Sequence, residues 1–314
     1  LLKKIQINKM DIRLYFHEFW GGFNKQDNFF VWILSQNHNV TVVDSNPNLV
    51  ISLNDRPFPD VYTIYFNGGE PYFPVPTPEI ADHFLGGFFL DYPNYTRFPA
   101  YYQYVYEFIK NGLIKDFSFF TQENRPIPPK TKFCSYVSRS LHGKRGRFFH
   151  KLNNVKKVET NVHPFKDFSI PFDNTSLNSS LPKINFIKDY KFNIAFENNF
   201  RATYPSYPNA VIENGEMVSM NGMISEKFIE PFISGVIPIY WGNDRIHEEY
   251  NPNSFLNYFD FESDEELIEK ILEIDSDDKL YQSYFKEPIV SNKQSNVINL
   301  DYLINLFENI IQNI

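Results

Sequence analysis

The chain has 314 residues, of which 42% are hydrophobic and 18% aromatic, so it can fill two ordinary globular domains and does not resemble a disordered chain. Its formal net charge of −8 offers no electrostatic basis for binding nucleic acid, and an anionic ligand must be held by a few placed cations. The single cysteine, Cys134, excludes an intrachain disulfide framework and lies in an apolar run that predicts a core position, while the seven histidines form no metalloenzyme motif.

The amino-terminal half reads as short apolar strands alternating with helical sequence. Strands are expected at 12–16, 40–43, 49–52 and 62–66, with helical periodicity at 29–36. Apolar strands separated by helices indicate a mostly parallel sheet that is covered on both faces. A proline-rich segment at 122–130 is the best candidate for a linker.

A second alternating series follows this linker. Strands are expected at 133–137, 156–159, 192–196 and 236–240, and helices at 146–152, 225–234, 265–274 and 299–311. The simplest α/β fold for this pattern has two doubly wound, Rossmann-like domains with a cleft between them. We place these domains at 1–128 and 129–296, and expect residues 297–314 to form a helix able to pack back on the first domain.

Two long polar segments interrupt the second series. Residues 165–185 and 199–221 are rich in Asn, Pro and Ser or Gly, and both are expected to be loops. At this length they are either functional lids or partly disordered segments.

The segment 222–242 contains an acid–base pair, Glu226 and Lys227, at the expected start of a helix. The first turn of a helix has unpaired backbone N–H groups and the positive end of the dipole, so it favours an anion. A lysine there could pair with a nucleotide diphosphate. The alternative is a surface helix start with a solvated charge pair, which is the commoner case for such a short motif.

Glu70 is expected just beyond the end of a strand, because it follows a Gly-Gly turn after the strand at 62–66 and precedes Pro71. A carboxylate at the carboxyl end of a strand faces the expected cleft and can take a proton from an incoming hydroxyl. The alternative is an exposed glutamate in a turn.

Basic residues gather at the start of the helix that follows the strand at 133–137, in the sequence Gly143-Lys144-Arg145-Gly146-Arg147. Cations oppose the dipole at the amino end of a helix, so a bound anion explains them better than helix stability does. A solvated basic patch is the alternative. A third polar site, ending in Asn198, follows the strand at 192–196 and could contact a base or sugar, or cap a turn.

These segments, in this order, resemble the family-10 glycosyltransferases, the α1,3/α1,4-fucosyltransferases. The resemblance lies in Tyr-Lys-Phe-x-x-x-Phe-Glu-Asn at 190–198, Gly-x-x-x-Glu-Lys at 222–227 and Pro-Ile-Tyr-Trp-Gly at 238–242. The family pattern is also matched downstream at 251–256, 260–261, Tyr284 and 287–288. The amino-terminal half matches more loosely around Trp20-Gly21, Gly69-Glu70 and 97–102.

This resemblance implies a GT-B fold, GDP-fucose as donor, inversion at the anomeric carbon, and no required cofactor or metal. By position, Glu70 matches the family's general base. Arg145 and Lys227 match residues that neutralise the diphosphate. Glu226 would contact ribose or fucose hydroxyls, and Asn198 would line the nucleotide pocket.

Two features depart from the family pattern beside the donor site. Met223 stands where the family has an aromatic residue, and the segment 199–221 is longer than in bacterial members. Gly222, Met223 and Ser225 are further candidates for the donor pocket, and Trp20 and Tyr72 are candidates for stacking on an acceptor sugar, although each aromatic could equally belong to a core.

Three functions stay open from the sequence. The first is fucosyl transfer to a GlcNAc- or glucose-containing glycan, the second is transfer from another GDP-sugar such as GDP-mannose, and the third is non-catalytic carbohydrate binding. The expected partners are therefore a nucleotide sugar and an oligosaccharide or glycoconjugate, with no nucleic acid. A complete chain would be cytoplasmic, whereas removal of an amino-terminal anchor would imply a Golgi lumenal or membrane-associated protein.

Overall fold

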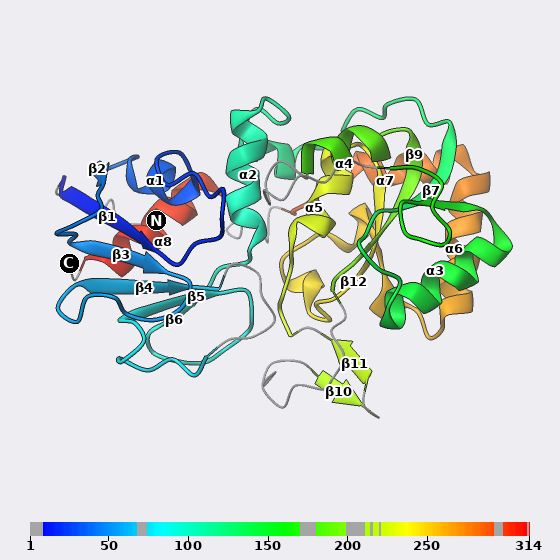
Figure 1. The fold of residues 1–314 in the computed structure, drawn as a ribbon. Coiled ribbons are helices and arrows are strands. Elements are labelled where there is room, and N and C mark those ends of the chain that lie inside the picture. Colours follow the sequence, from blue (N-terminus) through cyan, green and yellow to red (C-terminus); the bar gives the residue numbers. More distant parts are fainter. Residues whose placement is uncertain are drawn as a thin grey trace.

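The computed structural model describes residues 9–67, 74–169, 180–198, 211–213, 216–219, 221–291, 298–312 and 314, which form two lobes that each contain a parallel sheet (Figure 1). The first sheet has the order β2-β1-β3-β4-β5-β6. Its strands are β1 (Asp11–His17), β2 (Asn39–Val42), β3 (Leu49–Ser52), β4 (Tyr62–Phe66), β5 (His83–Gly86) and β6 (Tyr95–Arg97).

The second sheet has the order β13-β12-β9-β7-β8, and all its pairings are parallel. Its strands are β7 (Lys132–Tyr136), β8 (Val158–Thr160), β9 (Tyr190–Phe196), β12 (Ile237–Trp241) and β13 (Leu256–Asn257). An antiparallel hairpin of β10 (Val211–Glu213) and β11 (Glu216–Ser219) lies apart from both sheets (Figure 1). The strands expected from the sequence are confirmed in both lobes, and the structure adds β5, β6, β10, β11 and β13.

Eight α-helices lie in the described residues, and most begin at a side chain that accepts hydrogen bonds from the first turn. They are α1 (Phe29–Leu34), α2 (Tyr101–Lys110), α3 (Gly143–Val155), α4 (Ser180–Ile187), α5 (Glu226–Ile233), α6 (Asp264–Ser276), α7 (Asp278–Lys286) and α8 (Leu300–Ile311). The caps with such bonds are Asn28, Ser225, Ser263, Asp277 and Asn299. Short 3₁₀ turns occur at Phe117–Thr121, Ile246–Glu248, Pro252–Ser254 and Tyr258–Asp260.

The first lobe alternates strands and helices less than the sequence predicts. No helix occurs in its described connections between β2 and β6. Strands β2 and β3 have four residues each, about 13 Å, and an irregular connection can return over that distance without a helix.

One predicted loop is wrong at its carboxyl end. Within the segment 165–185, the residues from Ser180 onward form the start of α4. Pro182 lies in the first turn of this helix, where its missing N–H costs no internal hydrogen bond. The segment 199–221, also predicted as a loop, contains the hairpin of β10 and β11 among its described residues.

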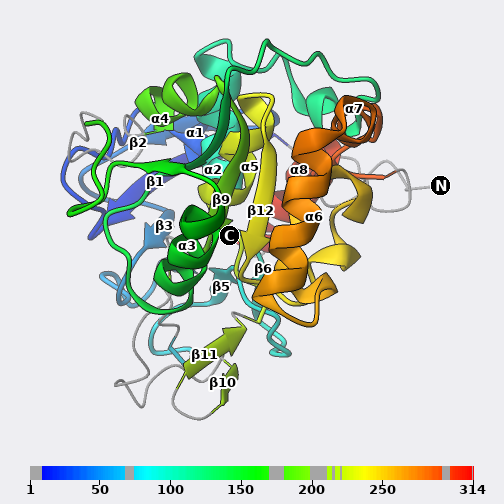
Figure 2. The same cartoon turned by 90° about the vertical axis from the view of Figure 1, so that its right-hand side faces the viewer.

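The second sheet is covered on both faces, as a doubly wound fold requires. Along β9, Phe192, Ile194 and Phe196 belong to one buried cluster, which includes apolar residues of α3, α6 and α7. Ala195, on the other face, belongs to the cluster that contains the apolar residues of α5. Strand residues alternate between faces, so α3, α6 and α7 cover one face of this sheet and α5 covers the other. Figure 2 shows α3 and α6 together on the near side of the sheet.

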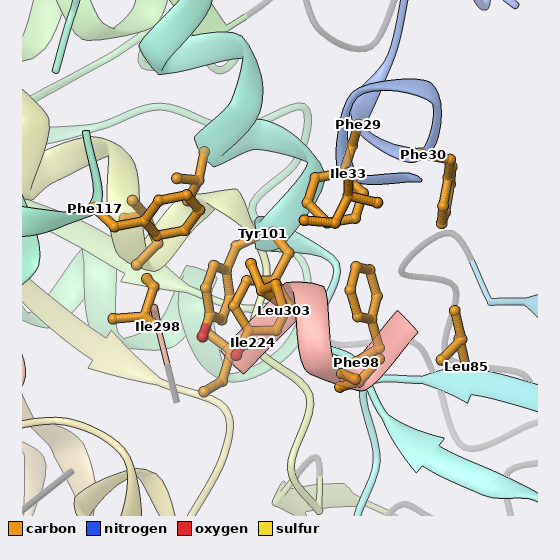
Figure 3. Close-up of a cluster of buried hydrophobic side chains, with 14 of the residues drawn as sticks. Phe29, Phe30, Ile33, Leu85, Phe98, Tyr101, Phe117, Ile224, Ile298 and Leu303 are labelled. Atoms are coloured by element: carbon orange, nitrogen blue, oxygen red, sulfur yellow. The ribbon is translucent and has the colours of Figure 1, made fainter. Parts of the chain in front are cut away.

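The two lobes share a core. Figure 3 shows Phe29 of α1, Tyr101 of α2 and Leu303 of α8 together with Ile224, which precedes α5 in the second lobe. The ring of Phe307 in α8 lies 6.0 Å from that of Phe29, so the last helix packs in the first lobe. Among the described residues, no helix combines the length and the apolar character needed to cross a bilayer.

Candidate functional site

The polar segments singled out from the sequence meet at the carboxyl ends of β7, β9 and β12. In this sheet the chain places β8 on one side of β7 and β9 on the other, so the strand order reverses between β7 and β9. The loops after these two strands therefore diverge and leave a crevice, which is the usual ligand position in open α/β sheets. The loop after β7 leads into α3, and β9 is followed by Glu197 and Asn198.

Arg145, in the first turn of α3, bridges this crevice. Its Nη1 donates to Asn198 Oδ1 over 2.8 Å, and its Nη2 donates to Ser140 Oγ over 2.9 Å. The side chain is buried, and its Nε has no hydrogen-bond partner within the described part of the chain. Its hydrogen-bond partners are thus neutral groups, and burying a cation without a counter-ion is costly unless an anion binds there.

Gly146 allows this arrangement. A Cβ on Gly146 would lie 1.7 Å from the backbone oxygen of Leu141, so the loop after β7 folds back directly onto the first turn of α3. This close approach brings Ser140 within reach of the Arg145 guanidinium. The glycine in the basic segment therefore has a packing role that its position in the sequence does not reveal.

A second group of predicted residues lies at the start of α5. Ser225 is the helix cap, and its hydroxyl accepts a hydrogen bond from the Lys227 N–H. The Lys227 ammonium lies 3.1 Å from Glu226 Oε1 and 3.2 Å from Ser225 Oγ. Lys227 therefore already has an acidic partner within its own turn, which the sequence-based prediction of an anion site did not include.

The charges at this helix start influence one another. Burial favours the neutral amine of Lys227, but the carboxylates of Glu226 and Glu197 outweigh it and raise the pKa of Lys227 above its ordinary value. Burial also disfavours the ionised form of Glu226, yet Lys227 and Lys183 hold the pKa of Glu226 below its ordinary value. Both side chains are therefore charged at neutral pH, and each is about four-fifths buried.

Glu197 is the first residue of the polar pair that ends in Asn198, which the sequence predicts either to contact a base or sugar or to cap a turn. Its carboxylate is completely buried, accepts the Ser225 backbone N–H at 2.7 Å and its hydroxyl at 2.6 Å, and lies 3.9 Å from the Lys227 ammonium. Burial raises the pKa of Glu197, although Lys227 opposes this effect. Gly242, which follows β12, leaves room for this side chain, because a Cβ at that position would lie 2.5 Å from Glu197 Cγ.

Met223 and Gly222 lie in the turn before α5. Met223 is buried in the apolar cluster that also contains Phe84 and Phe88 of the first lobe, and its carbonyl accepts a hydrogen bond from Tyr240 Oη at 3.2 Å. The residue that replaces the family's aromatic therefore belongs to packed interior. Gly222 has a φ of +100°, which favours glycine.

Lys144 places a further cation beside these strands. Its ammonium lies 4.3 Å from the ring centroid of Tyr258 and 5.7 Å from that of Trp241, which ends β12. Cation–π contacts hold the side chain along the sheet edge rather than extended into solvent. The basic segment at the start of α3 thus contributes two ordered cations, Lys144 and Arg145.

The remaining candidates belong to the first lobe. Glu70 and Tyr72 lie outside the described residues. The segment that carries them follows β4, whose last described neighbour, Asn67, is buried and donates its N–H to Leu85 O at 2.9 Å. Trp20 is half-buried in the loop after β1, with its ring 5.1 Å from that of Phe23. Since β1 and β4 are parallel strands of one sheet, Trp20 and Asn67 follow strands that end at the same edge of this sheet.

The structure therefore brings the predicted residues together in two groups in the second lobe. Arg145 and Asn198 form one group, and Ser225, Glu226 and Lys227 form the other. Glu197, adjacent to Asn198 and bonded to Ser225, joins them. Among the described residues, no group of three or more His, Cys, Asp or Glu side chains is arranged to hold a metal ion.

Comparison with known proteins finds relatives of similar sequence and solved structures of similar fold. Residues 212–295 match the family model described as glycosyltransferase family 10 (fucosyltransferase), carboxyl-terminal region. A protein of Acanthamoeba polyphaga mimivirus that is named as a fucosyltransferase is 31% identical over 180 residues, and the match covers 56% of this chain and 27% of that protein. An α-(1,3)-fucosyltransferase of Helicobacter pylori is 29% identical over 145 residues, covering 46% of this chain and 25% of its own. The matches span about a quarter of the length of these relatives.

Solved structures are similar over the whole chain. Crystal structures of an α1,3-fucosyltransferase, alone and with GDP-fucose, cover 100% of this chain and 93% and 94% of theirs, with TM-scores of 0.71 and 0.68 at 19% identity. At this identity the likeness shows the fold, and it confirms the predicted GT-B-like architecture with two parallel sheets. The resemblance of the sequence to glycosyltransferase family 10 is confirmed by the family model and the relatives together.

Proposed function

We propose that this chain is a family-10 glycosyltransferase that moves fucose from GDP-fucose, with inversion, to a hydroxyl of a GlcNAc- or glucose-containing glycan. The observation that supports this most directly is the buried Arg145 guanidinium, held by Asn198 and Ser140 at the reversal of strand order. A planar cation with neutral partners suits two-point contact with a diphosphate. The family resemblance and the donor present in a similar structure supply the identity of the nucleotide sugar.

In the proposed reaction, the acceptor oxygen attacks the anomeric carbon of fucose while the bond from that carbon to the β-phosphate oxygen breaks. GDP leaves, and a single displacement inverts the anomeric configuration. Glu70, in the family position of the base, takes the proton from the acceptor hydroxyl. Arg145 and Lys227 stabilise the negative charge that grows on the leaving diphosphate.

The two cations are not equivalent in this proposal. Lys227 is already compensated by Glu226 at 3.1 Å, whereas the partners of Arg145 are uncharged in the described structure. We therefore assign Arg145 the larger share of diphosphate binding. Glu226 would then fix the Lys227 ammonium and present its remaining oxygen to a ribose or fucose hydroxyl.

The acceptor side is assigned to the first lobe. Trp20 offers a half-buried aromatic face, and Tyr72 follows Glu70 in the segment after β4. An aromatic ring at the edge of a site can stack on the apolar face of a sugar. The identity of the acceptor and the linkage would follow from these loops.

Calorimetric titration with GDP-fucose, GDP-mannose, GDP and UDP, combined with a donor-hydrolysis assay, tests this function. We expect tighter binding of guanine than of uridine nucleotides and hydrolysis of GDP-fucose. Equal binding of GDP and UDP would overturn it. Turnover of GDP-mannose alone would favour the alternative donor, and binding of GDP-fucose without turnover or transfer would favour a non-catalytic role.

The matched variants are Arg145→Ala and Lys151→Ala, both on α3. Lys151 is exposed and pairs with Asp264 and Glu265 at 2.8 and 2.9 Å, so its loss leaves the crevice unchanged. Loss of a charge-assisted contact predicts an affinity for GDP-fucose about tenfold to a hundredfold lower in Arg145→Ala and unchanged in Lys151→Ala. Equal affinities in the two variants would contradict the assignment of Arg145.

A further inference from the structure

The turn that precedes α5 is contacted by an arginine of the other lobe. Arg97 ends β6 in the first sheet, and its guanidinium reaches the second lobe with both terminal nitrogens. Nη2 donates to the carbonyl oxygen of Gly222, and Nη1 pairs with the carboxylate of Glu249. The two side chains are 15% and 9% exposed, so this pair is largely shielded from solvent.

Phe89, in the loop after β5, supports the same contact. Its ring centroid lies 4.4 Å from the Arg97 guanidinium carbon and 3.9 Å from that of Arg245. Its backbone N–H donates to the carbonyl oxygen of Asn221 at 3.1 Å. The first lobe therefore binds the carbonyls of two consecutive residues, Asn221 and Gly222, through one backbone amide and one arginine.

Gly222 permits this close approach. A Cβ at this position would lie 2.7 Å from Phe89 Cδ2 and 2.9 Å from Phe89 N. Gly222 also has a φ of +100°, a backbone conformation that other residues rarely adopt, in the turn that presents its carbonyl to Arg97. Glycine in the family-like motif is thus required by contact with the first lobe.

The position of this turn determines where α5 begins. Two residues separate Gly222 from Ser225, and the carbonyl of one of them, Met223, is fixed by Tyr240 Oη. Ser225 donates its backbone N–H to Glu197 and caps the helix that carries Glu226 and Lys227. Displacement of the Gly222 carbonyl would therefore shift the cap and the charged pair relative to Arg145.

We propose that Arg97 is a positioning residue of the donor site, which makes the geometry at the start of α5 depend on the relative placement of the two lobes. The inference rests on the proposed function for its donor, but the contact itself can be tested without any ligand. Only a guanidinium presents two forked nitrogens to a carbonyl and a carboxylate at once, so lysine is not an adequate replacement.

The test compares Arg97→Met and Arg97→Lys with the control Arg56→Met. Arg56 pairs with Asp82 at 2.9 Å within the first lobe, with side chains 13% and 33% exposed, so the control also loses an arginine–carboxylate pair. Amide hydrogen exchange without ligand is measured over 86–90 and 221–226, and titration gives the affinity for GDP-fucose. We expect both Arg97 variants to exchange faster in these segments and to bind GDP-fucose about tenfold more weakly. Arg56→Met should change neither the exchange rates nor the affinity.

Unchanged exchange at 221–226 in a folded Arg97→Met protein would overturn the inference, as would equal effects in Arg56→Met. If Arg97→Met does not fold, Glu249→Gln serves instead. That variant removes the charge that orients the Arg97 guanidinium toward Gly222, so the Gly222 contact is weakened together with the ion pair. Faster exchange at 221–226 supports the inference, and wild-type exchange overturns it. Failure of the wild-type protein to bind GDP-fucose would refute the proposed function, while the exchange experiment would still decide the role of Arg97.

Discussion

Glu197 and Ser225 connect the end of β9 to the start of α5, because one buried carboxylate accepts both the backbone N–H and the hydroxyl of the serine, at 2.7 and 2.6 Å. These two hydrogen bonds fix the end of β9 against the start of α5, although Glu197 and Ser225 are 28 residues apart in the chain. They also place a negative charge 3.9 Å from Lys227, inside the group proposed to bind the donor.

Ser225→Ala should destabilise the protein more than loss of an ordinary helix cap. The substitution removes the cap of α5 and leaves one oxygen of the buried Glu197 without its donor. We expect the free energy of unfolding to fall by about 2–3 kcal/mol, measured by chemical denaturation. Ser263→Ala is the control, since Ser263 is the exposed cap of α6, and its loss should cost about 1 kcal/mol. Equal losses in both variants would show that the Glu197 bond adds nothing.

Gly146→Ala should disrupt the approach of the loop after β7 to α3. The added Cβ would meet a backbone oxygen of Leu141 at 1.7 Å, and backbone cannot move aside as a flexible side chain can. We expect a loss of about 2–3 kcal/mol in stability and weaker donor binding through displacement of Ser140. Gly21→Ala has no atom within 4 Å of its new Cβ and should leave the melting temperature nearly unchanged. A Gly146→Ala protein as stable as this control would contradict the packing described.

His83 should make the stability depend on pH. Burial lowers the pKa of His83 to about 4 from an ordinary 6.5, and its Nε2 lies 2.9 Å from Thr96 Oγ1. Since the folded-state pKa is the lower one, this contribution is present above pH 6.5 and is lost as the pH falls toward 4. Between pH 7.5 and 5 we expect the wild type to lose about 1–2 kcal/mol more than His83→Gln, measured by urea denaturation at both pH values. Parallel losses in the two proteins would rule this out.

Glu70→Gln tests the proposed base. An amide cannot accept the proton of the acceptor hydroxyl, so kcat should fall by about two to four orders of magnitude. The affinity for GDP-fucose should stay close to that of the wild type, because the proposed donor contacts lie in the second lobe. Steady-state kinetics and titration separate the two quantities. Unchanged turnover, or lost donor binding with the same kcat, would remove Glu70 from the role of base.

The spacing of apolar residues was sufficient to predict most helices and strands of the second lobe, and β1 to β4 of the first lobe. It did not reveal α2, where the sequence YYQYVYEFIK is dominated by tyrosine and other residues of modest helix propensity. Tertiary contacts decide this element, because Tyr101, Tyr102, Val105 and Phe108 are buried along one of its faces. Residues 180–185, which begin α4, were predicted as loop from their Asn, Pro and Ser content, although Pro182 is tolerated in the first turn of a helix.

The candidate site was only partly accessible from the sequence. Strand ends indicated where Arg145 and Asn198 lie, but their hydrogen bond depends on β9 being the neighbour of β7, and strand order cannot be read from periodicity. The role of Glu197 depends on the register of β9 against β12, in which Phe196 pairs with Trp241 and brings Glu197 beside Gly242. Contacts of this kind are long-range properties of the fold.

The return of α8 to the first lobe has a consequence for how the protein is made. Phe307 packs against Phe29 and Phe98, at ring distances of 6.0 and 5.9 Å, so the hydrophobic interior of the first lobe includes residues that the ribosome adds after the whole second lobe. The amino-terminal sheet leaves the exit tunnel first but lacks one of its covering helices until translation has passed residue 311. The apolar interior that the first lobe shares with α8 can therefore be completed only after the second lobe has been synthesised.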